Sequence, residues 1–184
     1  STSVIEKQNI STSITATGTI EPVTEVEVGT QVSGIIDRIY VDYNSIVEKG
    51  QVIAELDKTN LLSELASTQS NLANAQSSLT YQTANHNRYK ALFEKGLVSA
   101  NDYENAKLSY EQAVQQVKVQ QQSVQKAQTN LGYATITSPI DGIVLSKEVE
   151  EGQTVASAMT TPTLFIIAQD LTDMRVIADI DEAD

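Results

Sequence analysis

The middle of the chain carries a seven-residue repeat of apolar and small side chains. Before residue 94 the repeat positions are Leu65, Leu72 and Leu79, with Leu61, Thr68 and Ala75 between them. After residue 100 they are Tyr103, Tyr110, Val117, Val124 and Leu131, with Ala106, Ala113, Gln120 and Ala127 between them. A repeat of this kind, sustained over several heptads, is typical of coiled-coil helices. Because no long linker separates the two runs, the pattern predicts two helices, over 58–93 and 100–131, that pack antiparallel as a hairpin.

The segments on either side of this repeat share a second pattern, which is typical of short β-strands. Residues 32–57 read VSGIIDRIYVDYNSIVEKGQVIAELD, and residues 140–157 read IDGIVLSKEVEEGQTVAS. In both, apolar and polar residues alternate after a first glycine, and a Gly-Gln pair follows that predicts a turn with positive φ. The glycines are Gly34 and Gly50 in the first copy and Gly142 and Gly152 in the second. One copy cannot bury its own apolar face, so residues 25–57 and 133–168 are predicted to form one β domain together.

The two helical runs meet in the sequence RYKALFEKGLVSANDY, residues 88–103. Gly96 is predicted to take the left-handed conformation that ends the first helix, and Ser99 is predicted to cap the second helix. These local roles do not account for an exposed Arg88 or for Leu92, which lies one helical turn later and which we expect to be exposed at the tip. The two residues share an Arg-x3-Leu-x6-Ser spacing with Ser99.

The composition excludes several classes of function. The 184 residues include 24 acidic and 12 basic side chains, and this excess of acid argues against binding to nucleic acid or anionic lipid through bulk charge. Cysteine is absent, which excludes disulfides and thiolate metal sites. His86 is the only histidine, and no further metal ligands are arranged around it. The sequence shows no catalytic triad pattern and no phosphate-binding glycine loop, so we expect no enzyme and no cofactor.

The ends of the chain carry no targeting or membrane signal of their own. The longest apolar run is LFIIA, residues 164–168, which is too short to cross a bilayer. The first residues, STSV, lack a basic region followed by an apolar one, as a signal peptide requires. We expect both ends to be boundaries within a longer protein.

Six segments, in order along the chain, match a known family: VGTQVSG at 28–34, EKGQVIAELD at 48–57, the Arg88-x3-Leu92-x6-Ser99 spacing, TSPIDGIV at 137–144, EEGQTV at 150–155, and TPTLFIIAQDL with the final DIDEAD. In these segments the sequence resembles the periplasmic adaptor proteins of tripartite efflux pumps, also called membrane fusion proteins of the HlyD family. The tip spacing and the ending are the more specific parts. They are most similar to MacA-like adaptors of macrolide ABC exporters.

The resemblance implies an α+β fold: a lipoyl/biotinyl-like β-sandwich domain split by a long antiparallel α-helical coiled-coil hairpin, with fragmentary β-barrel strands at both chain ends. The expected divisions are an N-terminal strand from the barrel or membrane-proximal region at 1–22, the first lipoyl-like half at 23–57, the hairpin at 58–132 with its tip at 94–99, the second half at 133–169, and the start of the barrel at 170–184.

The resemblance also implies a function. A member of this family is a non-enzymatic periplasmic subunit, associated with the inner membrane, that links a transporter to a TolC-like outer-membrane channel for export of drugs or other molecules. The implied transporter is an ABC-type, MacB-like protein, and an adaptor for a proton-driven RND pump stays open as the alternative. The hairpins of six copies would form a tube, and Arg88, Leu92 and Ser99 match the family's channel-docking residues one for one.

A loop and a lysine are also compared with related proteins. MacA-like adaptors can carry a glutamine that gates the lumen in the loop after GQTV, and the matching positions here are Met159 and Thr160, so a gate would consist of thioether and hydroxyl groups. Lys58 resembles the modified lysine of lipoyl and biotinyl carriers, which makes a carrier domain of a multienzyme complex the alternative from another class. A carrier lysine lies on a tight turn between two half-domains. Here the helical pattern occupies that place, and we expect no modification.

Overall fold

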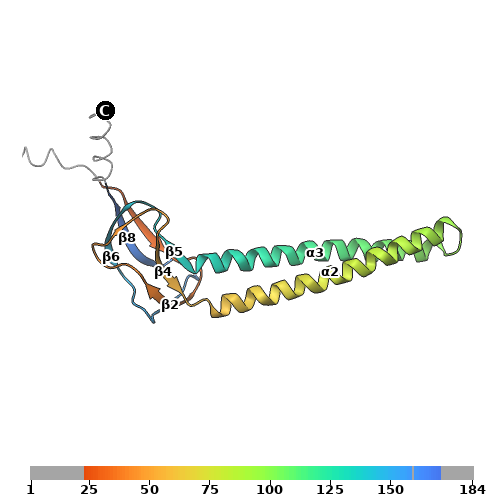
Figure 1. Cartoon of the computed structure of the whole chain (residues 1–184), viewed down its shortest axis with the longest axis horizontal. Helices are drawn as coiled ribbons and strands as arrows, with labels where there is room; N and C mark the ends of the chain where they lie inside the picture. Colours follow the sequence, from red (N-terminus) through yellow and green to blue (C-terminus); the bar gives the residue numbers. More distant parts are fainter. Residues whose placement is uncertain (1–22, 159, 171–184) are drawn as a thin grey trace, which may run out of the picture.

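The structure, a computed structural model, describes residues 23–158 and 160–170. Figure 1 shows a β domain at one end and two long helices that extend from it side by side. The predicted fold, a β domain split by an antiparallel helical hairpin, is therefore confirmed. The barrel strands expected at the two chain ends fall on 1–22 and 171–184 and lie outside the described residues.

The β domain consists of two four-stranded sheets in which every pairing is antiparallel, with strand orders β1-β8-β6-β3 and β5-β4-β2-β7. The strands are β1 (Glu25–Gly29), β2 (Gly34–Ile39), β3 (Ile46–Val47), β4 (Val52–Leu56), β5 (Thr135–Thr137), β6 (Gly142–Lys147), β7 (Thr154–Val155) and β8 (Thr163–Gln169). Each sheet combines two strands that precede the hairpin with two that follow it. The two halves therefore complete one core, as the sequence pattern predicts.

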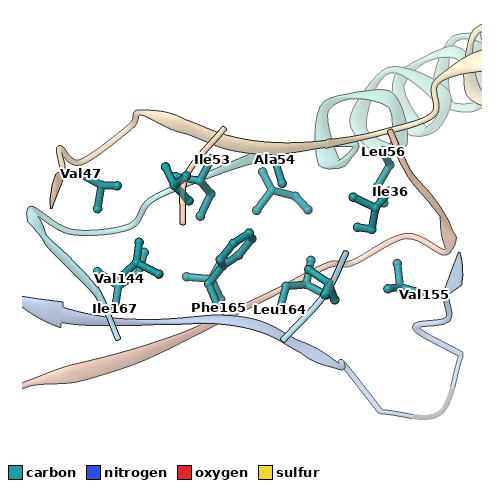
Figure 2. Packing of buried hydrophobic residues seen from close by; sticks show 14 of the residues in the cluster. Ile36, Val47, Ile53, Ala54, Leu56, Val144, Val155, Leu164, Phe165 and Ile167 are labelled. Carbon is teal, nitrogen blue, oxygen red and sulfur yellow. The ribbon is translucent and has the colours of Figure 1, made fainter. Parts of the chain in front are cut away.

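The core lies between these sheets and is built from large aliphatic side chains and one aromatic ring. Phe165 is the largest fully buried side chain, and Figure 2 shows its ring pointing away from β8 toward Ile53 and Ala54 on β4. Other large apolar residues that are at most 1% exposed include Ile36, Val47, Leu56, Val144, Leu164 and Ile167. Burying a side chain of this size stabilises a fold by about 1.5–3 kcal/mol relative to leaving it exposed.

The sequence repeat appears in the structure as two matched turns. Gly50 and Gly152 have φ angles of 86° and 88°, in the left-handed region that glycine adopts without strain. In each turn the following glutamine closes the loop with its side chain. Gln51 Oε1 accepts a hydrogen bond from the amide of the residue three positions earlier at 3.0 Å, and Gln153 Oε1 makes the equivalent bond at 3.1 Å. The predicted role of both Gly-Gln pairs as turns is confirmed.

A second matched pair was not apparent from the sequence. Thr30 and Ser138 are both 1% exposed, and each lies four residues before the first glycine of its copy. Thr30 Oγ1 donates a hydrogen bond to the carbonyl of Val32, and Ser138 Oγ donates to the carbonyl of Ile140, both at 2.7 Å. Each buried hydroxyl is therefore satisfied inside its own loop, which avoids the penalty of an unpaired polar group.

The hairpin consists of α2 (Thr59–Glu94) and α3 (Ala100–Tyr133), helices of 36 and 34 residues. These bounds lie within two residues of the predicted ranges. At a rise of about 1.5 Å per residue each helix is about 50 Å long, so the tip lies far from the β domain. At the base, the amide of Leu56 donates to the carbonyl of Ala134 at 2.8 Å, which joins the end of α3 to β4.

The seam between the helices differs in one respect from the prediction. Leu65, Leu72 and Leu79 face the seam but are only half-buried. The fully buried positions are mostly the small residues between the larger ones: Thr68, Ala75, Ala106, Ala113, Val117 and Ala127. A pair of helices covers a side chain from two directions only. Small residues in the seam are therefore enclosed, while the larger leucines keep part of their surface in solvent.

Candidate docking site at the hairpin tip

The first helix ends in a fixed turn. Gly96 has a φ angle of 72°, its amide donates to the carbonyl of Phe93 at 2.9 Å, and the amide of Leu97 donates to the carbonyl of Leu92 at 2.9 Å. This pair of bonds is the Schellman arrangement, which satisfies carbonyls at the end of a helix. The predicted left-handed role of Gly96 is confirmed.

The second helix begins at a side-chain cap. Ser99 has extended backbone angles, and its Oγ accepts a hydrogen bond from the amide of Asp102 at 3.0 Å. The predicted capping role of Ser99 is therefore confirmed, and Asp102 places a negative charge in the first turn, where the helix dipole favours it. Tyr103 of α3 packs across the seam on Phe93 of α2, with the two rings parallel and their centroids 5.0 Å apart. The tip is held by backbone, cap and ring contacts together.

Arg88 is exposed on α2, two turns before the end of the helix. Its Nη2 donates one long hydrogen bond to Asn85 Oδ1 at 3.4 Å. The ion pairs found in the described part of the chain join Lys58 to Glu55, and Lys147 to Asp42 and to another carboxylate; none involves Arg88. Most of the five guanidinium donors therefore remain available for a partner.

Leu92 differs from the sequence-based expectation. We expected an exposed leucine beside Arg88, but Leu92 is half-buried. The exposed apolar side chains at the tip are Leu97 and Phe93, which are 68% and 39% exposed. The Arg-x3-Leu-x6-Ser spacing does not include them. The sequence signal for Leu97 is its place directly after Gly96, where an apolar residue commonly follows the glycine that ends a helix.

An aromatic stack continues the seam behind the tip. The ring of His86 lies between Tyr103 and Tyr110, with centroid distances of 5.9 Å and 5.0 Å. His86 Nε2 is buried without a hydrogen-bond partner. Within the described residues, no group of three or more His, Cys, Asp and Glu side chains is placed to hold a metal ion. His86 thus acts as one ring in the helix seam.

Of the two loop positions compared with the family's lumen gate, Met159 lies outside the described residues, and Thr160 is exposed. The flanks of this loop are anchored to the β domain. The amide of Ser157 donates to Ser33 Oγ at 3.0 Å. On the other side, a Cβ added at Gly29 would come within 2.5 Å of the carbonyl oxygen of Pro162, so the loop returns in close contact with β1.

Lys58 belongs to a small polar network on the β domain. Its Nζ lies 3.1 Å from Glu55 Oε2, and the hydroxyl of Tyr40 donates to Glu55 Oε1 at 2.7 Å. The hydrogen bond from Tyr40 and that from Lys58 lower the pKa of Glu55, and the same bond to Glu55 raises the pKa of Tyr40. Lys58 therefore lies immediately before α2 as part of an ion pair, and not on a turn between the two β halves as a carrier lysine would.

A β domain assembled from two halves, with a long helical hairpin between them and an exposed tip, defines a class of elongated scaffold proteins. The chain belongs to the family described as RND MFP, barrel-sandwich hybrid domain, whose model matches residues 24–167. MFP stands for membrane fusion protein. This match confirms the resemblance to the adaptor family.

Individual relatives agree with this assignment. The macrolide export protein MacA of Escherichia coli O157:H7 is 28% identical over 100% of this chain and 53% of its own length. The multidrug resistance protein MdtA of Pantoea ananatis is 32% identical over 81% of this chain and 36% of its own length. The chain thus spans about half or less of the length of the curated relatives it matches.

Solved structures of the same family share the fold. MacA from Actinobacillus actinomycetemcomitans is 35% identical with a TM-score of 0.58, over 82% of this chain and 50% of that one. A MacA–MexA chimeric protein that contains the Pseudomonas aeruginosa MexA α-hairpin domain is 40% identical with a TM-score of 0.56, over 82% of this chain and 49% of that one. The similarity to MacA-type adaptors therefore includes both sequence and fold.

Proposed function

We propose that this chain is the central part of a periplasmic adaptor subunit, which links an inner-membrane ABC-type transporter to a TolC-like outer-membrane channel for export of drugs or other molecules. The observation that carries this proposal is the geometry of the hairpin: a shaft of about 50 Å that ends in a rigid turn with Arg88 exposed. Such a shaft serves to reach a distant partner. Its first turn packs Leu61 against the core of the β domain, and the rest of its length extends beyond that core.

The proposal gives this chain the role of a scaffold without catalysis. Membrane fusion proteins are adaptors. In this proposal the exposed tip contacts a partner and the hairpin supports the tip. In the full-length protein this subunit is associated with the inner membrane. Neither helix of the described residues has the length and apolar character that a membrane span needs. In the assembled pump, six copies with their hairpins side by side would form the conduit.

Two observations favour different transporters. The description of the matching family names RND membrane fusion proteins, which favours an RND pump. The relatives and structures named MacA favour an ABC exporter. We choose the ABC transporter because the structure of MacA matches this chain at 35% identity and the MacA–MexA chimera, which contains the MexA hairpin domain, matches at 40%. The RND pump is the second candidate.

A photo-crosslinking experiment tests the docking half of the proposal. The full-length protein is expressed in its own host with a photoreactive amino acid at position 88, 92 or 99, and with a control at Gln115, which is exposed midway along α3. Mass spectrometry then identifies the captured proteins. We expect the tip positions to capture an outer-membrane channel and the control position to capture none. Tip crosslinks that contain only inner-membrane proteins would contradict the docking role.

A second experiment separates the two transporters. The full-length protein is added to each candidate transporter in lipid vesicles, and ATP hydrolysis and proton-driven export are measured separately. An ABC partner predicts stimulated ATP hydrolysis. Stimulation of proton-driven export alone would replace the ABC transporter with the RND pump and leave the docking proposal intact.

A further inference from the structure

We propose that Leu97, rather than Leu92, is the main apolar anchor of the tip, and that it inserts into an apolar cleft at the periplasmic end of the outer-membrane channel. This inference rests on the proposed function and deepens it, since it names the anchoring residue and the chemistry of the surface that receives it.

The exposure of the two leucines gives the first reason. Leu97 is 68% exposed, and it exceeds every other large hydrophobic side chain of α2, α3 and the turn between them, including Tyr81 at 62%. Leu92 is half-buried, and its carbonyl is used to hold the turn. A partner that approaches the tip can therefore bury much more apolar surface on Leu97 than on Leu92.

The local structure explains only part of this position. In a Schellman turn the residue at the place of Leu97 is commonly apolar, because it packs on the last turn of the helix. Leu97 is nevertheless 68% exposed, so any such packing leaves most of the residue in solvent. The turn accounts for an apolar residue after Gly96, but not for one that projects as far as a leucine.

The backbone on both sides of Leu97 is fixed. Gly96 is held by its bond to the carbonyl of Phe93, and the amide of Leu97 itself is bonded at 2.9 Å. Val98 is half-buried, and Ser99 is the cap of α3. A side chain presented from a rigid turn loses little backbone entropy when it binds, so more of its buried area appears as affinity.

The neighbours of Leu97 indicate the kind of surface that receives it. Phe93 adds a second partly exposed apolar group, and Arg88 adds unused hydrogen-bond donors two turns from the end of α2. An apolar centre beside a charged rim is the usual arrangement of an interface hot spot. The receiving surface is therefore an apolar cleft that has carbonyl or carboxylate acceptors near its edge.

Three substitutions in the full-length protein test the inference. Leu97→Gln and Leu97→Met introduce unbranched side chains of similar size, so any effect of lost branching on the turn is common to both and only polarity differs. Leu108→Gln makes the same change at a leucine that is 53% exposed on the shaft of α3. Association with the purified outer-membrane channel is measured by biolayer interferometry, and thermal unfolding is recorded for each variant.

We expect Leu97→Met and Leu108→Gln to bind the channel like the unsubstituted protein, and Leu97→Gln to bind about tenfold more weakly, as the loss of buried apolar area at one leucine predicts. Equal binding by Leu97→Gln and Leu97→Met would overturn the anchor role and leave the proposed docking function in place. Failure of the unsubstituted protein to bind any channel of its host would overturn both.

Discussion

The β domain and the hairpin bury their apolar residues in different ways. In the β domain, Phe165, Ile53 and Leu56 are at most 1% exposed and are surrounded from both sheets. In the hairpin, the enclosed residues are mainly alanines such as Ala113, and the leucines of the heptad pattern stay half-buried. The stability of the β domain is therefore concentrated in a few large side chains. That of the hairpin is divided into small, similar contributions along the two helices.

The β domain and the hairpin also differ in charge. Residues 59–133 carry six basic and five acidic side chains, whereas residues 23–58 and 134–170 carry four basic and twelve acidic ones. The hairpin is thus nearly neutral, and the acidity of the chain lies in the β domain and the ends. Hairpins of neighbouring copies can approach one another with little electrostatic repulsion, which agrees with the proposed tube.

The largest effect is expected at the centre of the β domain. Phe165→Ala removes the largest fully buried side chain and leaves a cavity, so it should lower the free energy of unfolding by about 3–5 kcal/mol. Urea denaturation followed by circular dichroism measures the change. The same substitution at Phe93, which is 39% exposed at the tip, serves as the control and should have a much smaller effect. Equal losses at both sites would contradict the contrast between the two parts.

An overpacked seam is expected to be the next most damaging change. Ala127 is 4% exposed in the seam between the helices, so Ala127→Leu should overpack the seam and destabilise the chain by about 1–3 kcal/mol. Gln128→Leu, at an exposed neighbouring position, is the control. The helical signal at 222 nm during thermal unfolding reports the difference. If Ala127→Leu unfolds at the same temperature as the unsubstituted protein, a small residue at this position of the seam is not required.

The cap of α3 is expected to contribute less than either. Ser99→Ala removes the acceptor for the amide of Asp102, which is bonded at 3.0 Å, and should cost about 0.5–2 kcal/mol. Ser78→Ala, at an exposed position inside α2, should be neutral or slightly stabilising because alanine favours helix. Hydrogen exchange at the first turn of α3 provides the measurement. Unchanged exchange in Ser99→Ala would mean that the turn holds without its cap.

The smallest effect on stability is expected at Arg88, together with a large effect on assembly. Arg88→Ala removes an exposed side chain whose one internal bond is 3.4 Å long, so unfolding should change by no more than about 0.5 kcal/mol. Channel association should nevertheless fall sharply. Lys118→Ala removes an exposed charge from the shaft and should change neither quantity. Normal export by Arg88→Ala would show that the tip spacing is structural.

The helices, the Gly-Gln turns and the cap at Ser99 could be predicted because each depends on local chemistry. A heptad repeat identifies the seam-facing side of a helix, and positive φ points to glycine. The depth of burial could not be predicted, because a repeat does not say how many helices surround the seam. For this reason the repeat predicts a buried Leu65 and the tip spacing an exposed Leu92, whereas both residues are half-buried. The hydroxyl pair of Thr30 and Ser138 required the two loops to be seen in space.

The pairing of β4 with β5 has a consequence for the order in which the chain folds. The register joins Glu55 to Thr135, two residues that are separated in sequence by the whole of α2 and α3. Closing so long a loop as a random coil costs about 2–3 kcal/mol more entropy than closing a short one. A helical hairpin that forms first brings the two strands together and removes most of that cost, because its contacts need only a short turn at Gly96. Seam residues such as Val117 should then show high φ-values in folding kinetics, and β5 residues such as Ile136 low ones. In this chain the part that reaches outward in the finished protein would also be the part that brings the two halves of the β domain together.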